Sequence, residues 1–353
     1  MDVLRPVLVN INGRIYRKNP VQEETYEEEE EEYDRSYSGA ASEQCLDEPC
    51  DSYSIEQTDR GFRCAVDVPS VLYKYIIGKK GETRKRLESE TKTSISIPKQ
   101  GVEGPIVITG AHRAGVSSAV TRVEVLIDSF RRKQPFTHFL SFALNHGEVQ
   151  QGFLRFREQV LERCGQDAGV DESIFQNPAK LHLTIGTLAL LNEQEVTRAS
   201  ELLQRCQDTI RDITEAKALP VEVRGIEYMN DDPSMVDVLY AKVAVQDGSD
   251  KLQQITDRLV ECFSAAGLME RERVKIHGTV MNTLFRKDPS AEDKGASARP
   301  GAKEREAFDA RNVLQMFAEF YFGALELNSV QISQRFSTDA SGYYSSAGHI
   351  TFS

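Results

Sequence analysis

The chain has 353 residues, which is enough for two domains that each bury a hydrophobic core. Its formal net charge of −12 is unevenly distributed: residues 1–60 contain 16 acidic and 6 basic side chains, whereas residues 61–133 contain 14 basic and 7 acidic ones. The basic segment keeps nucleic acid among the candidate partners, and no apolar stretch is long enough to predict a transmembrane helix. The six cysteines form no Cys-x-x-Cys pair, so we expect reduced thiols in an intracellular protein, without a zinc site.

Residues 1–60 predict an acidic tail that is disordered apart from one short segment. VLVNINGRIYRKNP alternates apolar residues around Asn12-Gly13, a pair typical of a tight hairpin, but it is too short to form its own core. The run EETYEEEEEEYD repels itself and is expected to be extended. A solvated tail is the simpler interpretation of these acids, and a partner-docking segment is better supported at residues 3–18. The candidate docking residues are Leu4, Val7, Val9, Ile11, Ile15 and Tyr16.

Residues 61–134 predict a compact α+β domain. GFRCAVDVP has the period of a strand, and two short helices, SVLYKYII and ETRKRLESETK, follow it. The strands TSISIPK and PIVITG come next, and a long amphipathic helix with Val116, Val120 and Val123 on its apolar stripe completes the domain before Gln134-Pro135. The predicted order is therefore strand, helix, helix, strand, strand, helix.

The sequence GKKG joins the two short helices within this basic segment. In that position it resembles the loop of an RNA-binding KH domain of type I topology, which implies that the glycines let the backbone approach a sugar-phosphate chain. The lysines would add salt-dependent affinity for phosphate. A structural turn with solubilising lysines is the alternative. The expected RNA-binding residues are Gly78, Lys79, Lys80, Gly81, Ile77, Arg84 and Lys85, and Ile76, Ile95 and Ile97 are further candidates for an apolar strip, some of which must belong to the core.

Residues 136–353 predict an α+β layered fold of two similar halves. Asn192 and Glu195 form a capping box at the start of one of the helices. The charged, Gly- and Pro-rich segment KDPSAEDKGASARPGAKERE predicts a long loop. The expected strands are FTHFLSFAL, KLHLTIGTL, PVEVRGIEYM, VDVLYAKVAV, VKIHGTVMN and those around FGALELNSVQIS and GHITF.

Two of these strands repeat the motif Lys-apolar-His-x-Thr, where x is any residue. A lone histidine is more often structural than catalytic, but two such strands side by side would direct two imidazoles and two hydroxyls into one groove. One imidazole could then accept a proton while the other donates one, as phosphodiester cleavage requires, without a metal or other cofactor. The catalytic candidates are His182, Thr184, His277 and Thr279. His349-Ile350-Thr351 is a third His-x-Thr, but it lacks the preceding lysine.

The paired motif resembles the two-histidine phosphoesterase superfamily, in the branch that includes nuclear-localisation domains of kinase-anchoring proteins. The whole chain, from the acidic tail to the last strand, also resembles one subunit of a multiprotein complex. That resemblance implies a nuclear protein that works beside a large helicase subunit and other subunits of the complex, in transcriptional coactivation and repair of alkylated DNA. The N-terminal segment would dock on that complex.

Three functions stay open at this stage: an RNA phosphodiesterase, a non-catalytic RNA- or phosphate-binding adaptor that regulates a helicase, and a structural scaffold. The expected ligand is single-stranded RNA, with single-stranded DNA as the alternative, and no membrane partner is expected.

Overall fold

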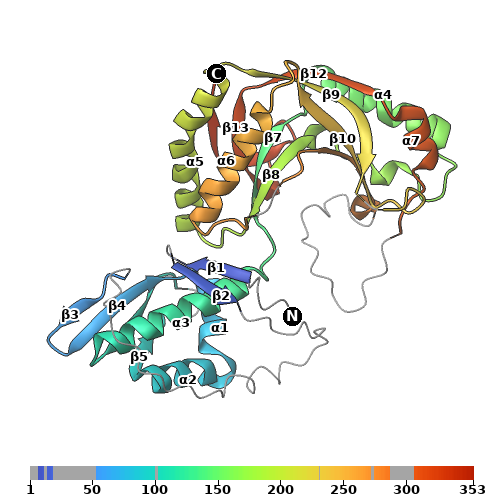
Figure 1. Cartoon of the computed structure of the whole chain (residues 1–353). Coiled ribbons are helices and arrows are strands. Elements are labelled where there is room, and N and C mark those ends of the chain that lie inside the picture. The colour runs from blue at the N-terminus through green and yellow to red at the C-terminus, as the bar shows by residue number, and fades with distance from the viewer. Residues whose placement is uncertain are drawn as a thin grey trace. The chain divides into compact units, whose positions relative to one another are not determined.

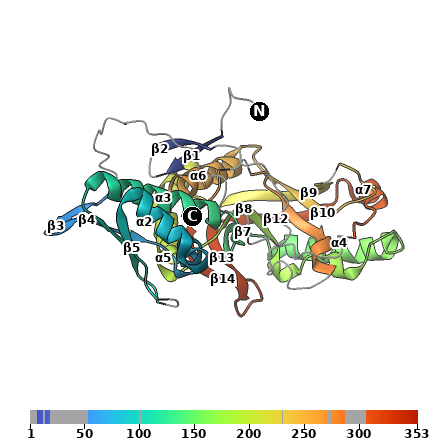
Figure 2. The ribbon, with the colours of Figure 1, turned by 90° about the horizontal axis from the view of Figure 1, so that it is seen from below.

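The computed structural model describes residues 7–11, 14–18, 53–99, 102–229, 231–271, 274–286 and 306–353. The chain divides into two compact units, Met1–Gln134 and Pro135–Ser353, and each is considered by itself (Figures 1 and 2). Within the described ranges, no helix is both long and apolar enough to cross a membrane.

Two short strands lie near the N-terminus. β1 (Val7–Ile11) pairs antiparallel with β2 (Arg14–Lys18), with Val9 opposite Tyr16. The antiparallel pairing predicted from the apolar alternation is therefore confirmed. Leu4, Asn12-Gly13 and the acidic segment at 19–52 lie outside the described residues.

The rest of the first unit has the predicted order of elements. Its helices are α1 (Tyr73–Ile77), α2 (Glu82–Thr91) and α3 (Arg113–Arg131). Its strands, β3 (Glu56–Thr58), β4 (Gly61–Asp67), β5 (Thr93–Ser96) and β6 (Pro105–Gly110), form one antiparallel sheet in the order β3-β4-β6-β5. Helix α3 buries Val116, Val120 and Val123 as its apolar stripe predicts. Burial of each such side chain stabilises the fold by roughly 1.5–3 kcal/mol.

This unit begins earlier than the sequence pattern suggests. Strand β3 extends the sheet, with Glu56 opposite Arg63, and the Tyr53 hydroxyl donates a hydrogen bond of 2.6 Å to Glu124. The sequence pattern places residues 53–60 in the tail, and that boundary is wrong. The reason is that a three-residue edge strand with exposed residues has no apolar alternation to reveal it.

The second unit is built on one eight-stranded sheet, in which all neighbouring strands are antiparallel. The strand order β12-β9-β10-β11-β8-β7-β13-β14 gives two groups of four that meet between β11 and β8. At that central joint the register has one recorded pair, Gly278 opposite Leu183. The strands are β7 (His138–Ala143), β8 (His182–Leu188), β9 (Leu219–Tyr228), β10 (Val238–Val245), β11 (Gly278–Asn282), β12 (Tyr321–Leu327), β13 (Ser329–Thr338) and β14 (Tyr344–Thr351).

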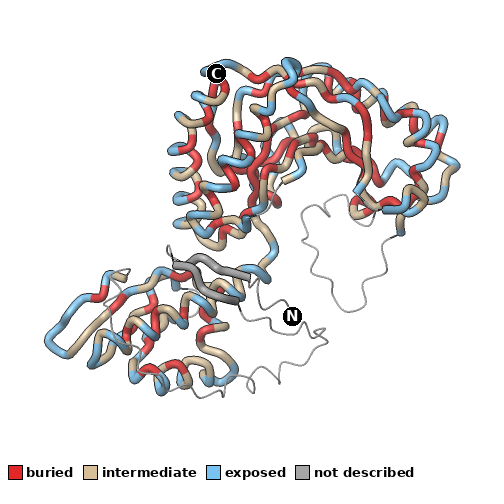
Figure 3. The backbone as a smooth tube through the Cα atoms, viewed as in Figure 1, coloured by how far each residue is buried: buried red, intermediate tan, exposed pale blue. Residues whose placement is uncertain are grey.

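Helices cover each group of strands. Beside the first group, α4 (Gly147–Cys164) packs against β12, and α7 (Arg311–Phe317) contacts α4 and β9 (Figure 1). Beside the second group, α5 (Glu193–Thr214) packs against β14, and α6 (Lys251–Ala265) lies beside α5. The predicted cap of α5 is present, since Asn192 accepts a hydrogen bond of 2.9 Å from the backbone N–H of Glu195. Buried residues follow the strands and the helix faces turned toward them (Figure 3).

One strand of this sheet is shorter than predicted. The pattern VKIHGTVMN suggests a strand from Val274, but β11 begins at Gly278, so His277 immediately precedes the strand. The ladder pairs of β11 with β10 and β8 begin at Gly278. Residues 274–277 continue the apolar alternation but have no ladder pair with either strand, and alternation alone does not make a strand.

The contact between α4 and β12 depends on a glycine. A Cβ atom at Gly152 would overlap the carbonyl oxygen of Phe322. We expect Gly152→Ala to lower the free energy of unfolding by about 1–3 kcal/mol, because helix and strand must separate to admit the methyl group. Urea denaturation measures the change, and Gln151→Ala, at an exposed position on the same helix, is the control that should change it by less than about 0.5 kcal/mol. Equal effects of the two substitutions would contradict the prediction.

Candidate active site and nucleic-acid interface

The two histidine motifs lie side by side, although 95 residues separate them in the sequence. Because Gly278 is opposite Leu183 in an antiparallel pair, the residues before and after them align His277 with Thr184 and Thr279 with His182. All four candidate residues are half-buried, so neither ring is sealed in the core. The joint between the two halves therefore brings two imidazoles and two hydroxyls together.

Both imidazoles are held in the same way. The Nδ1 atom of His182 lies 2.7 Å from the carbonyl oxygen of Lys180, and the Nδ1 atom of His277 lies 2.6 Å from the carbonyl oxygen of Lys275. A carbonyl oxygen can only accept, so Nδ1 must carry the proton in each ring. In the neutral ring, Nε2 is then left with a lone pair, and it is the atom available for proton transfer.

Aromatic rings support the His182 half of the site. The His182 ring packs against Phe139 and Tyr344, at centroid distances of 5.1 Å and 5.5 Å. The ammonium of Lys180 lies 4.9 Å from the centre of the same Tyr344 ring. Lysine and histidine of the motif thus contact one buried tyrosine.

The His277 half repeats this arrangement on another strand. The His277 ring packs against Tyr240 at 5.1 Å, and the Lys275 ammonium lies 5.0 Å from the centre of the Tyr240 ring. Sequence reasoning missed Tyr240, Tyr344 and Phe139. Their strands read as ordinary apolar strands, and only the sheet order shows that each ring reaches a histidine.

The surroundings of His277 affect its protonation. Burial lowers the pKa of His277, and the nearby His182 and the Lys275 ammonium lower it further, while the hydrogen bond to the Lys275 carbonyl opposes the shift. The neutral ring is therefore favoured at His277, as a proton acceptor requires.

The third His-x-Thr sequence lies elsewhere. His349 is exposed on β14, and strands β13 and β7 separate β14 from β8 in the sheet. The Gln204 side chain donates a 2.8 Å hydrogen bond to the His349 carbonyl oxygen. His349 is therefore not part of the paired constellation.

The GKKG loop joins α1 to α2 as predicted. Gly78 ends α1, its N–H donates to the carbonyl oxygen of Lys74 at 2.9 Å, and its φ of +70° lies in the region that favours glycine. A Cβ atom at Gly78 would overlap the Thr83 side chain. Gly81, with φ of +82°, precedes α2, and Lys79 and Lys80 between the glycines are exposed. The loop thus presents two lysines on a tightly turned backbone.

The other residues predicted to bind RNA differ in their exposure. Ile76 and Ile95 are 0% and 2% exposed and belong to the core, whereas Ile77 and Ile97 are only half-buried and remain available for an apolar strip. On α2, Lys85 is exposed, and the half-buried Arg84 forms an ion pair of 3.8 Å with Glu88.

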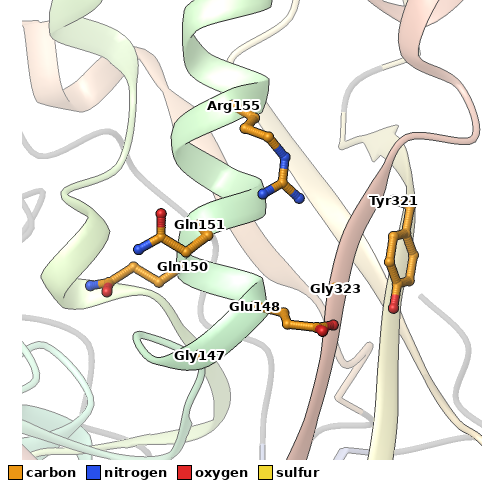
Figure 4. Close-up of a pocket in the computed structure, with 7 residues that line it drawn as sticks. All are labelled: Gly147, Glu148, Gln150, Gln151, Arg155, Tyr321 and Gly323. Carbon is orange, nitrogen blue, oxygen red and sulfur yellow. The ribbon is translucent and has the colours of Figure 1, made fainter.

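Two cavities of the second unit are lined by other residues than the paired histidines. One of about 700 Å³ lies between the start of α4 and β12, where Glu148 reaches toward the strand and accepts a hydrogen bond of 3.3 Å from the Ala324 N–H (Figure 4). None of the four candidate catalytic residues lines it. In the described part of the chain, no group of three or more His, Cys, Asp or Glu side chains is placed to hold a metal ion.

Known protein families match both units. The sequence model of the AKAP7 2'5' RNA ligase-like domain matches residues 136–352, and that of the KH domain matches residues 63–125. The chain thus combines a KH domain, a nucleic-acid-binding module, with a two-histidine phosphoesterase-like domain.

The chain is also similar to one curated relative and to two solved structures. The chain is 58% identical over 360 residues, covering all of both proteins, to activating signal cointegrator 1 complex subunit 1 of Mus musculus. It therefore belongs to the family of that subunit. Two crystal structures, of TT0787 from Thermus thermophilus and of E. coli LigT in apo form, are 15% and 12% identical. They cover 61% and 62% of this chain and 97% and 98% of their own, with TM-scores of 0.35 and 0.34.

The pKa of His277 can be tested without a substrate. We expect its imidazole to titrate below pH 6.5 in the folded protein, because burial penalises the cation. The folded state then binds this proton less readily than the unfolded state. The resulting contribution to stability is complete above pH 6.5 and is lost as the pH falls through the folded pKa. NMR titration, with the His277 signal assigned from the spectrum of His277→Gln, measures the value, and a pKa of 6.5 or higher would contradict the prediction.

Proposed function

We propose that the protein is a single-stranded RNA-binding subunit whose paired histidines cleave or process RNA phosphodiester bonds. The observation that supports this most is the alignment of each histidine with the threonine of the other strand, with Nδ1 of both rings bound to a backbone carbonyl. Two imidazoles and two hydroxyls then lie on one face of the sheet, and these are the groups that metal-independent phosphoryl transfer needs.

His277 is the proposed general base. Its environment favours the neutral ring, whose Nε2 lone pair can take a proton from a ribose 2′-hydroxyl or from water. The oxygen that loses this proton attacks phosphorus. The hydrogen bond from Nδ1 to the Lys275 carbonyl remains in place during the transfer and favours the cation as it forms.

His182 is the proposed general acid. In its protonated form it donates the Nε2 proton to the oxygen that leaves phosphorus, while Nδ1 stays bound to the Lys180 carbonyl. Each proton transfer of this kind contributes roughly 10²–10⁴ in rate. Thr184 and Thr279 donate hydrogen bonds to the non-bridging oxygens, where negative charge increases in the transition state. No step in this sequence needs a metal ion.

The KH domain is proposed to hold the single strand. The exposed lysines of the GKKG loop and the half-buried Ile77 suit a sugar-phosphate chain and an unstacked base, respectively. RNA is the proposed strand, because a 2′-hydroxyl supplies the nucleophile for cleavage without water. Single-stranded DNA is the alternative ligand for the KH domain.

Relatedness to a complex subunit supports a set of partners and a location. We propose that the chain acts in the nucleus, beside a large helicase subunit and other subunits of the activating signal cointegrator 1 complex, in transcriptional coactivation and repair of alkylated DNA. Residues 3–18, which include strands β1 and β2, are the proposed docking segment.

A non-catalytic adaptor is the second candidate function. The same four side chains could recognise phosphate without turnover, and the protein could report RNA occupancy to a partner helicase. The aromatic rings packed against both histidines are consistent with a rigid recognition site as well as with a catalytic one.

An assay of RNA cleavage distinguishes the enzyme from the non-catalytic adaptor. We expect the purified protein to cleave short RNAs that end in a 3′-hydroxyl or a 2′,3′-cyclic phosphate, and His182→Ala or His277→Ala to lower the rate at least about 100-fold, because each removes one proton transfer. His349→Ala, which changes the exposed histidine on β14, is the matched control and should retain the wild-type rate. Products are measured by gel electrophoresis and mass spectrometry. RNA that stays intact while bound to the wild-type protein would support the adaptor instead.

The KH loop is tested by binding. Lys79→Asp combined with Lys80→Asp should weaken binding of single-stranded RNA and reduce the slope of log affinity against log salt by about 1.4, since each lost phosphate contact changes it by about 0.7. Fluorescence anisotropy over a range of salt concentrations measures both quantities. Lys217→Asp with Lys251→Asp changes the charge equally in the second unit and is the control. If the loop variant binds as the wild type does, the GKKG loop is not the contact surface.

A further inference from the structure

The two histidines are held in the sheet differently. His182 is the first residue of β8 and is paired with Ala143 of β7, so the strand ladder fixes its backbone. His277 and the three residues before it precede β11 and have no such pairing. A cavity of about 610 Å³ also opens along Val274, Lys275 and Ile276. The backbone that carries His277 therefore needs another restraint if the ring is to keep one orientation.

Three side chains provide contacts that could supply this restraint. Glu227 and Tyr240 face each other across β9 and β10, and the Tyr240 hydroxyl donates a hydrogen bond of 2.7 Å to Oε2 of Glu227. The Lys275 ammonium lies 3.0 Å from the same Oε2 atom and also hydrogen-bonds to the Tyr240 oxygen. Lys275 is thus tied to two neighbouring strands of the sheet through its side chain.

This network is attached to His277 at two points. The Lys275 carbonyl oxygen accepts the hydrogen bond from Nδ1 of His277, and the Tyr240 ring packs against the imidazole. Tyr240 is 1% exposed, which makes it a rigid support, whereas the Lys275 side chain is 68% exposed. An ion pair this exposed contributes little to stability, so a role in overall folding explains it poorly.

The charges of the network persist over the range in which a histidine titrates. The Tyr240 hydroxyl and then the Lys275 ammonium hold the pKa of Glu227 below its usual value. Hydrogen bonds to Tyr240 and Glu227 raise the pKa of Lys275. Glu227 therefore stays ionised and Lys275 stays protonated from mildly acidic to mildly basic pH.

We propose that Lys275, Glu227 and Tyr240 form a positioning network for His277: the anchored lysine fixes the carbonyl that binds Nδ1, and this keeps the ring and its Nε2 atom in one orientation. These three are positioning residues and need not contact the substrate. The catalytic consequence rests on the proposed phosphodiesterase function, but the structural consequence, a single tautomer and orientation of the His277 ring, does not.

The tautomer of His277 tests the network directly. We would record the imidazole nitrogen shifts of His277 by ¹H–¹⁵N NMR at about pH 8, where a histidine is neutral. In the wild type we expect a single form with the proton on Nδ1. In Lys275→Met and in Glu227→Ala we expect a mixture of the two tautomers, because the Lys275 carbonyl is no longer held in place.

Lys251→Met is the matched control. It removes another lysine of the same unit, whose ammonium lies 3.0 Å from Glu215 in an ion pair that includes none of the three network residues. Its His277 tautomer should equal that of the wild type, and its thermal unfolding curve should match those of the other two variants. His277 held in the wild-type tautomer in both network variants would overturn the proposal, whether or not the protein turns over RNA.

Kinetics give a second readout where the wild type cleaves RNA. We expect Glu227→Ala to lower kcat on the order of tenfold with KM almost unchanged, since a displaced general base affects the reaction step rather than binding. A rise in KM at unchanged kcat would assign Glu227 to substrate binding through Lys275 and would also overturn the positioning role. Absence of turnover in the wild type refutes the proposed phosphodiesterase alone, because the NMR result still decides the network.

Discussion

The pairing of β11 with β8 is the contact on which the candidate active site depends. It joins two groups of four strands into one sheet, and its recorded register is a single residue pair, Gly278 opposite Leu183. A shift by one residue would turn each motif to the other face, because side chains alternate along a strand. The buried leucines of β8 oppose such a shift, since it would expose them to water. The hydrophobic core thus sets the register, and the register places the histidines.

At this joint, backbone carbonyl oxygens set the tautomer of both imidazoles. Each imidazole donates from Nδ1 to the carbonyl two residues before it, a local contact that both copies of the motif make by themselves. The supporting rings, in contrast, come from distant strands: Tyr344 from β14 and Tyr240 from β10. Each half of the site therefore combines a local hydrogen bond, which sets the tautomer, with a long-range packing contact, which sets the plane of the ring.

Sequence patterns predicted long elements better than short ones. The buried stripe of α3, the cap at Asn192 and the long strands of the second unit follow from apolar periodicity and capping chemistry, which act over neighbouring residues. Strand β3 was missed, because three exposed residues carry no periodic signal. The start of β11 was placed too early, because apolar alternation continues through a segment that has no partner strand. Ile76 and Ile95 could not be separated from Ile77 and Ile97 for a similar reason, since isoleucine suits both a core and a binding strip.

The sequence by itself determined the α+β order of elements, the GKKG loop between two helices and the duplicated histidine and threonine motif. These features depend on residue type and on spacing within a few positions, and both can be taken directly from the sequence. The tertiary structure alone decided that β8 and β11 are neighbours, that two strands lie between β8 and the strand of His349, and that Glu227 and Tyr240 reach Lys275. Contacts of this kind depend on which strands pair. Pairing is settled by burial across the whole sheet, which no local pattern records.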